Sequence, residues 1–148
     1  MVSPQVLRQF PAFTRALERS VRSIAVISHE RRFKAGEGIF SEGQQADHVY
    51  LVVEGEVDVT FEINHGKVII DTLMPGEMVC WSAVIDPYLA SATALARTDV
   101  RLIAIDGPEL LRLFERDSSL AYYVMREVVR CLTYRLKATH VQLADLMS

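Results

Sequence analysis

Cysteine is scarce in this sequence, and long apolar runs are missing from it. The two cysteines, Cys80 and Cys131, are too far apart for a metal knuckle and too few for a disulfide framework, so free thiols in a reducing compartment fit best. No apolar run approaches the roughly 18 residues that span a bilayer. Charged residues interrupt the N-terminal segment, unlike the core of a signal peptide, so we expect a cytoplasmic protein.

The sequence also lacks an excess of charge of one sign. It has 16 Lys and Arg against 19 Asp and Glu, a formal net charge of −3, and the two signs are interspersed. Because nucleic acids and anionic membranes bind basic patches, we expect neither DNA nor a membrane as a partner. Hydrophobic residues make up 50% of the 148 positions, which is enough for one core, so we predict a single domain over residues 1–148.

Motifs for catalysis and for metal binding are absent as well. The sequence has no P-loop, no nucleophile elbow and no His-Glu pair at helical metal spacing, and its histidines are scattered. The nearest approach to a phosphate-cradling glycine motif, residues 36–41, lacks a third glycine and precedes a strand pattern rather than a helix. We therefore predict a protein that is not an enzyme and holds no metal or cofactor.

The sequence does contain a clear change of hydrophobic period. Within residues 1–29 apolar residues recur at helical spacing, broken at Pro11, which predicts two or three short helices. Over residues 30–105 the period shortens to two and glycines separate short β-branched runs, which predicts about eight antiparallel strands. Gly55 and Asn64-His65-Gly66 stand where such strands would reverse in tight turns.

The helical period returns in residues 106–148. Asp106 is expected to cap a helix that has Pro108 in its first turn, and Ser118 or Ser119 is expected to cap a long last helix. The predicted fold is therefore α+β but mainly β. It is an antiparallel β-roll, or jelly roll, flanked by N-terminal helices and by a long C-terminal helix.

Glycines at fixed spacing connect this pattern with a known family. They occur in Gly36, Glu42-Gly43, Gly55 and Pro75-Gly76-Glu77, each at a point where a strand must turn. With this spacing and this order of elements, residues 10–147 resemble the cyclic-nucleotide-binding domain. That domain is shared by Crp/Fnr-like bacterial regulators, regulatory subunits of cyclic-AMP-dependent kinase and cyclic-nucleotide-gated channels. The glycines shape the backbone, so they indicate the fold rather than the function.

The resemblance fails at the family's phosphate-binding cassette. In the family this segment runs Phe-Gly-Glu-Leu-Ala and ends in Pro-Arg-Ala-Ala-Thr, and its arginine pairs with the cyclic phosphate while its glutamate binds the ribose. Here Cys80 replaces the glycine, Trp81 the glutamate and Ala90 the arginine, and no Lys or Arg occurs between Val68 and Ala96. An unpaired buried phosphate would cost several kcal/mol. We therefore predict a pocket that does not bind cyclic AMP or cyclic GMP in the family's usual way.

The expected pocket has an apolar and aromatic lining with a few hydroxyl groups, which suits a neutral or aromatic small molecule. Its residues are Val79, Cys80, Trp81, Ser82, Ala83, Ala90, Ser91, Ala92 and Thr93, joined, on the family's pattern, by Thr139 and His140. Two alternatives stay open. Either Trp81 fills the vacated space and the roll is a ligand-free interaction scaffold, or backbone amides hold a cyclic nucleotide without the arginine. Haem, which some family members bind, would need Cys80 or a histidine as an axial ligand, and the sequence fixes no such pair.

The last helix carries an apolar stripe with alternating spacings of four and three. This seam consists of Met125, Val129, Leu132, Leu136, Thr139, Leu143 and Leu146. A stripe of this period either faces a partner helix or packs on the chain's own roll. Because the resemblance implies dimerisation through this helix, we predict a homodimer in which Thr139 couples the ligand to helix packing. The family's transcription factors continue into a winged helix that is missing here, so we expect another protein to be the effector.

Overall fold

The computed structural model describes residues 1–64 and 66–148, so part of the predicted Asn64-His65-Gly66 turn lies outside the described residues. Two short helices, α1 (Pro4–Leu7) and α2 (Glu18–Val26), come first. The strands are β1 (Ser28–Phe33), β2 (Gly38–Phe40), β3 (His48–Glu54), β4 (Val57–Ile63), β5 (Gly66–Leu73), β6 (Met78–Val79), β7 (Thr93–Ala96) and β8 (Val100–Asp106). The short 3-10 helix η1 (Trp81–Val84) lies between β6 and β7, and α3 (Gly107–Arg116) and α4 (Ser118–Met147) complete the chain.

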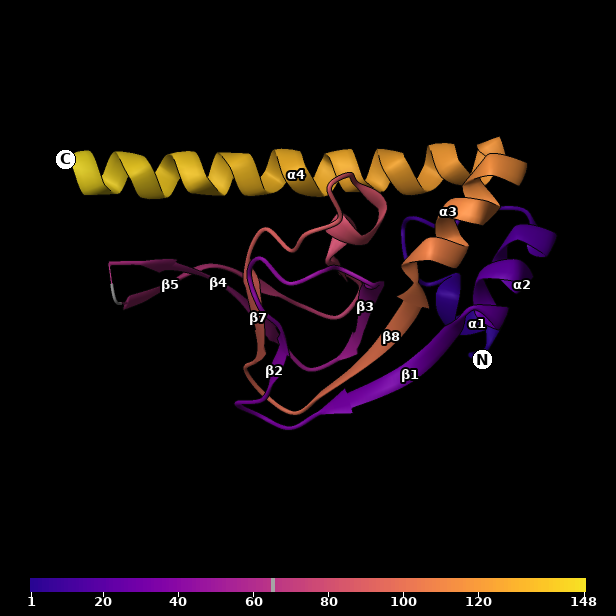
Figure 1. Cartoon of the computed structure of the whole chain (residues 1–148), viewed down its shortest axis with the longest axis horizontal. Helices are drawn as coiled ribbons and strands as arrows, with labels where there is room; N and C mark the ends of the chain where they lie inside the picture. The colour runs from indigo at the N-terminus through magenta and orange to yellow at the C-terminus, as the bar shows by residue number, and fades with distance from the viewer. Residues whose placement is uncertain (65) are drawn as a thin grey trace.

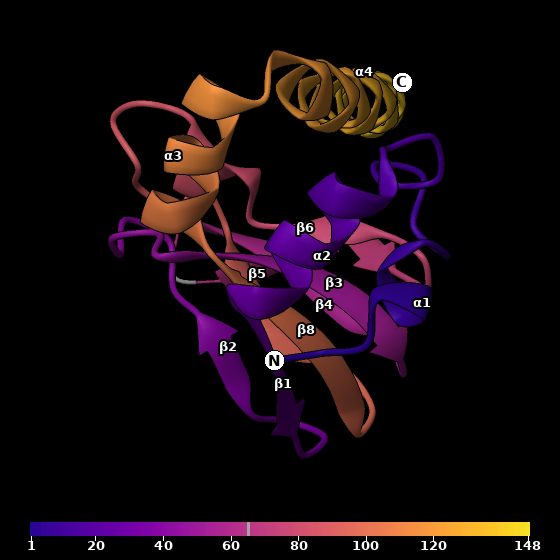
Figure 2. The ribbon, with the colours of Figure 1, turned by 90° about the vertical axis from the view of Figure 1, so that its right-hand side faces the viewer.

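The strands form two four-stranded antiparallel sheets, in the orders β1-β8-β3-β6 and β2-β7-β4-β5. Strands β3 and β8 are buried at consecutive positions rather than at alternate ones. This pattern is typical of strands covered on both faces. The helices α1, α2 and α3 gather at one end of the roll, and α4 runs across its top (Figure 1), so that Figure 2 looks along the axis of α4. The structure confirms the predicted fold, with eight strands in the described residues and a long C-terminal helix.

The turns and caps follow from local chemistry. Gly55 has φ +88°, and a Cβ atom there would lie 2.2 Å from the carbonyl oxygen of Asp99, so only glycine fits this predicted turn. The Asp106 carboxylate accepts a hydrogen bond of 2.9 Å from the Glu109 amide, which confirms it as the cap of α3.

The predicted cap of the last helix was wrong. Asp117, not Ser118 or Ser119, accepts a hydrogen bond of 3.1 Å from the Leu120 amide. Because α4 starts directly after α3 ends, Asp117 is the only residue between the two helices. Both serines lie within the first turn of α4 and cannot cap it.

The long helix α4 has two different environments. Its first half packs on the rest of the core through Leu120, Val124 and Val128, each only 1% exposed. Its second half continues past the centre of the roll and lies over the hairpin formed by β4 and β5 (Figure 1). No helix in the described part of the chain is long and apolar enough to cross a membrane.

Candidate functional site

The segment expected to correspond to the family's phosphate-binding cassette is closed. It comprises the end of β6 and η1, and Cys80, Trp81, Ser82 and Ala83 are all buried. The cavity at this place measures only about 10 Å³, which is barely enough for one water molecule. It is lined by Phe40, Val59, Val79, Cys80, Trp81, Ser82, Ala90, Ser91, Ala92 and Arg135.

Cys80 has a backbone conformation that is unusual for a residue with a side chain. Its φ of 65° is in the left-handed region, which glycine adopts more readily than other residues. Burial raises the pKa of the Cys80 thiol to about 12. The thiol is therefore protonated at neutral pH, and Cys80 is a small core residue rather than a reactive nucleophile.

Trp81 is covered by an arginine from the other end of the sequence. The guanidinium carbon of Arg135, on α4, lies 4.3 Å from the centroid of the Trp81 ring, which is a favourable cation–π geometry. Trp81 lines both spaces, so its indole forms a wall between the closed cassette and the space under α4. The pair joins η1 to the middle of α4.

A cavity of about 720 Å³ lies on the far side of this wall, between the β4–β5 hairpin and α4. Its size falls within the range of cavities that hold small ligands. The lining comprises Phe61, Ile63, Val68, Ile70, Trp81, Ser91, Ala92, Leu132, Arg135, Thr139, Gln142, Leu143, Asp145 and Leu146. Most of these side chains are apolar. The Gln142 amide donates a hydrogen bond of 3.3 Å to the Ile69 carbonyl oxygen and so ties the helix to the hairpin.

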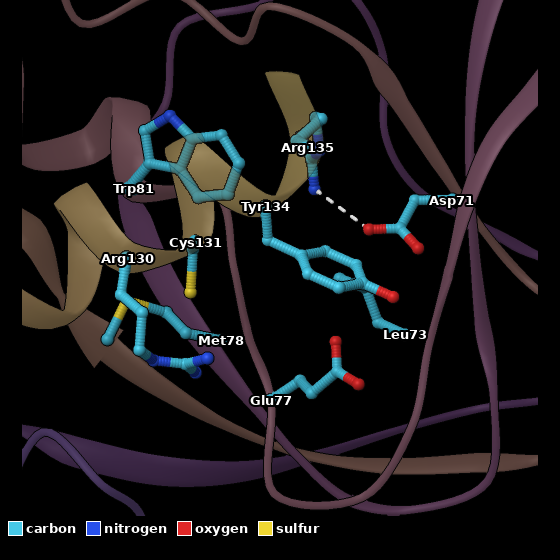
Figure 3. A pocket seen from close by; sticks show the side chains of 9 residues that line it. All are labelled: Asp71, Leu73, Glu77, Met78, Trp81, Arg130, Cys131, Tyr134 and Arg135. Atoms are coloured by element: carbon cyan, nitrogen blue, oxygen red, sulfur yellow. Dashed lines mark ion pairs between the residues drawn. The ribbon is translucent and has the colours of Figure 1, made fainter. Parts of the chain in front are cut away.

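A smaller polar pocket of about 250 Å³ lies below the middle of α4 (Figure 3). Figure 3 shows the guanidinium of Arg135 directed at the carboxylate of Asp71, at a distance of 3.9 Å between Nη2 and Oδ2. Burial lowers the pKa of Arg135, and the negative charge of Asp71 opposes that shift. Burial also raises the pKa of Glu77, and Asp71 adds to that effect. Cys131 lines the same pocket, and burial raises its pKa to about 11.

The residues expected to form one pocket are divided between these spaces. Val79, Cys80, Ser82 and Ala90 line the closed cassette, Thr139 lines the large cavity, and Trp81, Ser91 and Ala92 line both. Ala83, Thr93 and His140 line neither of them. The Thr93 hydroxyl accepts a hydrogen bond of 2.9 Å from the Glu42 amide, which is a structural role.

Sequence reasoning missed Arg135 and the hairpin wall of the large cavity. That wall consists of Phe61, Ile63, Val68 and Ile70. The sequence contains a signal for this wall. Its apolar residues stand at alternate positions on two paired strands, so their side chains share one face of the hairpin. Arg135 directly precedes the seam residue Leu136, and nothing local distinguishes it from an exposed arginine.

Known proteins share this fold and this sequence pattern. The family model of the cyclic nucleotide-binding domain matches residues 30–117. A CRP-like cAMP-activated global transcriptional regulator of Mycobacterium tuberculosis is 28% identical over 116 residues, which are 78% of this chain and 50% of that protein. The cAMP-dependent protein kinase regulatory subunit of Dictyostelium discoideum is 30% identical over 135 residues, which cover 88% of this chain and 40% of that protein.

One solved structure is similar to this chain over nearly the full length of both proteins. It is that of a proposed cyclic nucleotide-binding protein from Geobacter metallireducens GS-15, with a TM-score of 0.82 and 31% identity over 92% of this chain and 99% of the other. In contrast, this chain spans half or less of the length of the two curated relatives above. The family match covers more than half of the residues, including α3 and both sheets except for the first two residues of β1. The chain belongs to the cyclic nucleotide-binding domain family.

Proposed function

We propose that this chain is a non-enzymatic regulatory module that senses a small ligand in the cavity between the β4–β5 hairpin and α4. The observation that carries this proposal is the contrast between the two spaces on either side of Trp81. The cassette cavity measures about 10 Å³ and the neighbouring cavity about 720 Å³. The named relatives support a regulatory role, since one is a transcriptional regulator and the other a kinase regulatory subunit.

The ligand is not a cyclic nucleotide held in the family's usual way. Ala90 stands where the family has its phosphate-binding arginine, and the cation that lines the cassette cavity is Arg135. Trp81 covers that guanidinium at 4.3 Å, and Asp71 is 3.9 Å from it. To reach that guanidinium from the cassette, a cyclic phosphate would have to open a closed segment whose cavity measures about 10 Å³.

The alternative is a ligand-free interaction scaffold in which Trp81 fills the space that a nucleotide would occupy. Trp81 is only 7% exposed and does occupy the cassette, as a ligand-free scaffold requires. However, Trp81, Ser91 and Thr139 also border an open cavity, and collapsed side chains would have left no such space. This second observation favours a sensor over a scaffold.

We also propose that the module is a homodimer that joins through the seam on α4 and signals to a protein effector. The side of α4 that packs on the chain's own roll carries Leu120, Val124 and Val128. The seam is on a neighbouring side, and Val129, Leu136 and Leu146 within it are 59%, 56% and 84% exposed. A second copy of the helix would bury these side chains. Four seam residues, Leu132, Thr139, Leu143 and Leu146, also line the cavity, which would couple the ligand to the dimer.

Calorimetric titration of the full chain with cyclic AMP and cyclic GMP tests the ligand claim. We expect no binding at micromolar concentrations. The triple variant Cys80→Gly, Trp81→Glu, Ala90→Arg rebuilds the family's cassette and should gain micromolar binding of cyclic AMP. The matched control is Cys80→Gly, Trp81→Gln, Ala90→Gln, which has similar volumes without the charges and should not bind. Micromolar binding by the unmodified chain would overturn the proposal and show that backbone amides replace the arginine.

A further inference from the structure

The large cavity has an apolar body and a polar end. Its apolar walls are the hairpin residues Phe61, Ile63, Val68 and Ile70 and the helix residues Leu132, Leu143 and Leu146. Several of these side chains are substantially exposed, among them Ile63, Val68 and Leu143. Covering such side chains is favourable, so the body of the ligand should itself be apolar.

The charges of the described lining lie far apart. They belong to Arg135 and Asp145, which are ten positions apart on one helix and hence roughly 15 Å apart along its axis. Arg135 stands at the end next to the closed cassette, because it lines that cavity too. Asp145 stands near the exposed C-terminus of α4. An anionic group would therefore be attracted to the inner end and repelled from the outer end.

Arg135 has donors that the described residues do not satisfy. Its side chain is only 15% exposed. Nε has no hydrogen-bond partner in the described part of the chain, and Nη2 is 3.9 Å from Asp71, which is beyond hydrogen-bond range. A buried guanidinium has five N–H donors, and a carboxylate can accept two of them side by side. Ser91, which also lines both cavities, lies at the same end.

The remaining polar groups argue against a larger polar ligand. Thr139 donates its hydroxyl to the carbonyl oxygen of Arg135 at 2.9 Å, and Gln142 donates to Ile69 at 3.3 Å. A nucleotide would bury several ribose hydroxyls and ring nitrogens in a mostly apolar lining where the Thr139 hydroxyl and the Gln142 amide already donate to the protein, and each group left unpaired carries a cost. A dianion would add a surplus negative charge beside Asp71. A neutral ligand would bring no charge to pair with the Arg135 guanidinium.

We infer that the ligand is a small amphipathic carboxylate, with its head group on Arg135 and its apolar body between the β4–β5 hairpin and α4. This inference rests on the proposed function and adds the chemical class of the ligand. Because Asp71 is on β5 and Arg135 on α4, the incoming carboxylate competes with Asp71 for the same guanidinium. Binding therefore weakens one of the contacts that hold the helix on the hairpin, and it does so next to the seam residue Leu136.

Three compounds that share the same ten-carbon chain but differ in their head groups test the inference. Decanoate, decan-1-ol and decylamine are titrated against the full chain below the concentrations at which they aggregate. The chain has one tryptophan, Trp81, and it lies against Arg135, so its fluorescence reports on the head-group end of the cavity. We expect decanoate to bind at least about tenfold more tightly than either analogue, as a charged hydrogen-bonded pair requires.

Two variants separate the contribution of the carboxylate head group to binding from that of the decyl chain. Arg135→Gln should weaken decanoate binding by about tenfold or more and leave decan-1-ol binding unchanged, which also shows that the variant is folded. Asp71→Asn should strengthen decanoate binding several-fold, because it removes the competitor for Arg135. Arg126→Gln is the matched control, since Arg126 is exposed on the same helix and does not line the cavity.

The outcomes distinguish this inference from the proposed function. Equal affinities for the three compounds, preference for decylamine, no binding of any of them, or an unchanged affinity of Arg135→Gln for decanoate would each overturn the carboxylate assignment. Those results leave a sensor of another ligand class standing. Micromolar binding of cyclic AMP in competition with decanoate would instead overturn the proposed function itself.

Discussion

The two halves of α4 have similar apolar content but very different surroundings. One face of the first half is buried, with Leu120, Val124 and Val128 each 1% exposed, whereas the second half has no buried residue, and Leu136 and Leu146 there are 56% and 84% exposed. The difference shows that an apolar stripe on a helix does not by itself indicate where the helix is buried. It also separates two tasks, because the first half is part of the core and the second half borders a cavity and presents a free face.

The reason for this difference is the element below each half. The first half lies over the core and η1, while the second half lies over the β4–β5 hairpin (Figure 1). The hairpin and the helix leave about 720 Å³ between them. Arg135 to Asp71 and Gln142 to Ile69 are polar contacts that connect the two across this space. A region held in this way can respond to a ligand at little cost to the core.

The largest expected effect is on stability and should appear only in the first half. Leu120→Ala removes buried methyl groups and should lower the free energy of unfolding by about 2–5 kcal/mol. Leu136→Ala, the matched control in the second half, should change it by less than about 0.5 kcal/mol in the monomer. Urea denaturation at low protein concentration measures both. Similar losses in the two variants would mean that the second half is also part of the core.

The second prediction concerns association through the seam. Leu136→Glu would place two carboxylates in a symmetric interface and should raise the dimer dissociation constant by at least about tenfold. Sedimentation velocity over a range of concentrations measures this change. Lys137→Glu, at the next position but outside the seam, is the control and should leave the dimer intact. A chain that stays monomeric at high concentration, or a dimer indifferent to Leu136→Glu, would rule out the seam as the interface.

Much of the fold could be predicted because it depends on local rules. The switch from helical to alternating period marked the roll, and Gly55 stood where the backbone comes within 2.2 Å of where a side chain would begin. Asp106 was identified as a cap because a carboxylate one residue before a helix accepts its free amides. The last cap was missed although Asp117 is an equally good capping residue, because the length of the connection between α3 and α4 was not known.

The candidate site was less predictable because it depends on packing between distant segments. Cassette residues such as Cys80 and Ala90 could be predicted by comparing positions with the family, and their assignment to a ligand site stays a prediction. The contact between Trp81 and Arg135 could not be predicted, because it joins η1 to the middle of α4 and depends on the angle at which the helix crosses the roll. The cavity itself was missed for the same reason, since spacing in the sequence does not show how far apart two elements stand.

The third prediction concerns the start of α4. Asp117→Ala removes the cap and the hydrogen bond that Asp117 accepts from Ser20, and it should cost about 1 kcal/mol at neutral pH. Ser118→Ala is the matched control and should cost less than about 0.5 kcal/mol. The hydrogen bond from Ser20 lowers the pKa of Asp117. The stabilisation is therefore present above the ordinary pKa of about 3.9 and is lost as the pH falls below it. Thermal unfolding at several pH values tests both statements.

The smallest effect is expected at the junction between the two halves, where Glu77 lines the polar pocket below α4. Burial, with a contribution from Asp71, raises the pKa of Glu77. The folded state therefore favours the protonated acid, and the free energy of unfolding should decrease as the pH rises above the ordinary value of about 4.3. Because Glu77 is partly exposed, the change should not exceed about 0.5 kcal/mol. Between about pH 4 and pH 7, the melting temperature of Glu77→Gln should rise relative to that of the unmodified chain. A trend in the opposite direction would mean that Arg130 and Arg135 outweigh burial, and that the pocket below the helix junction favours a negative charge.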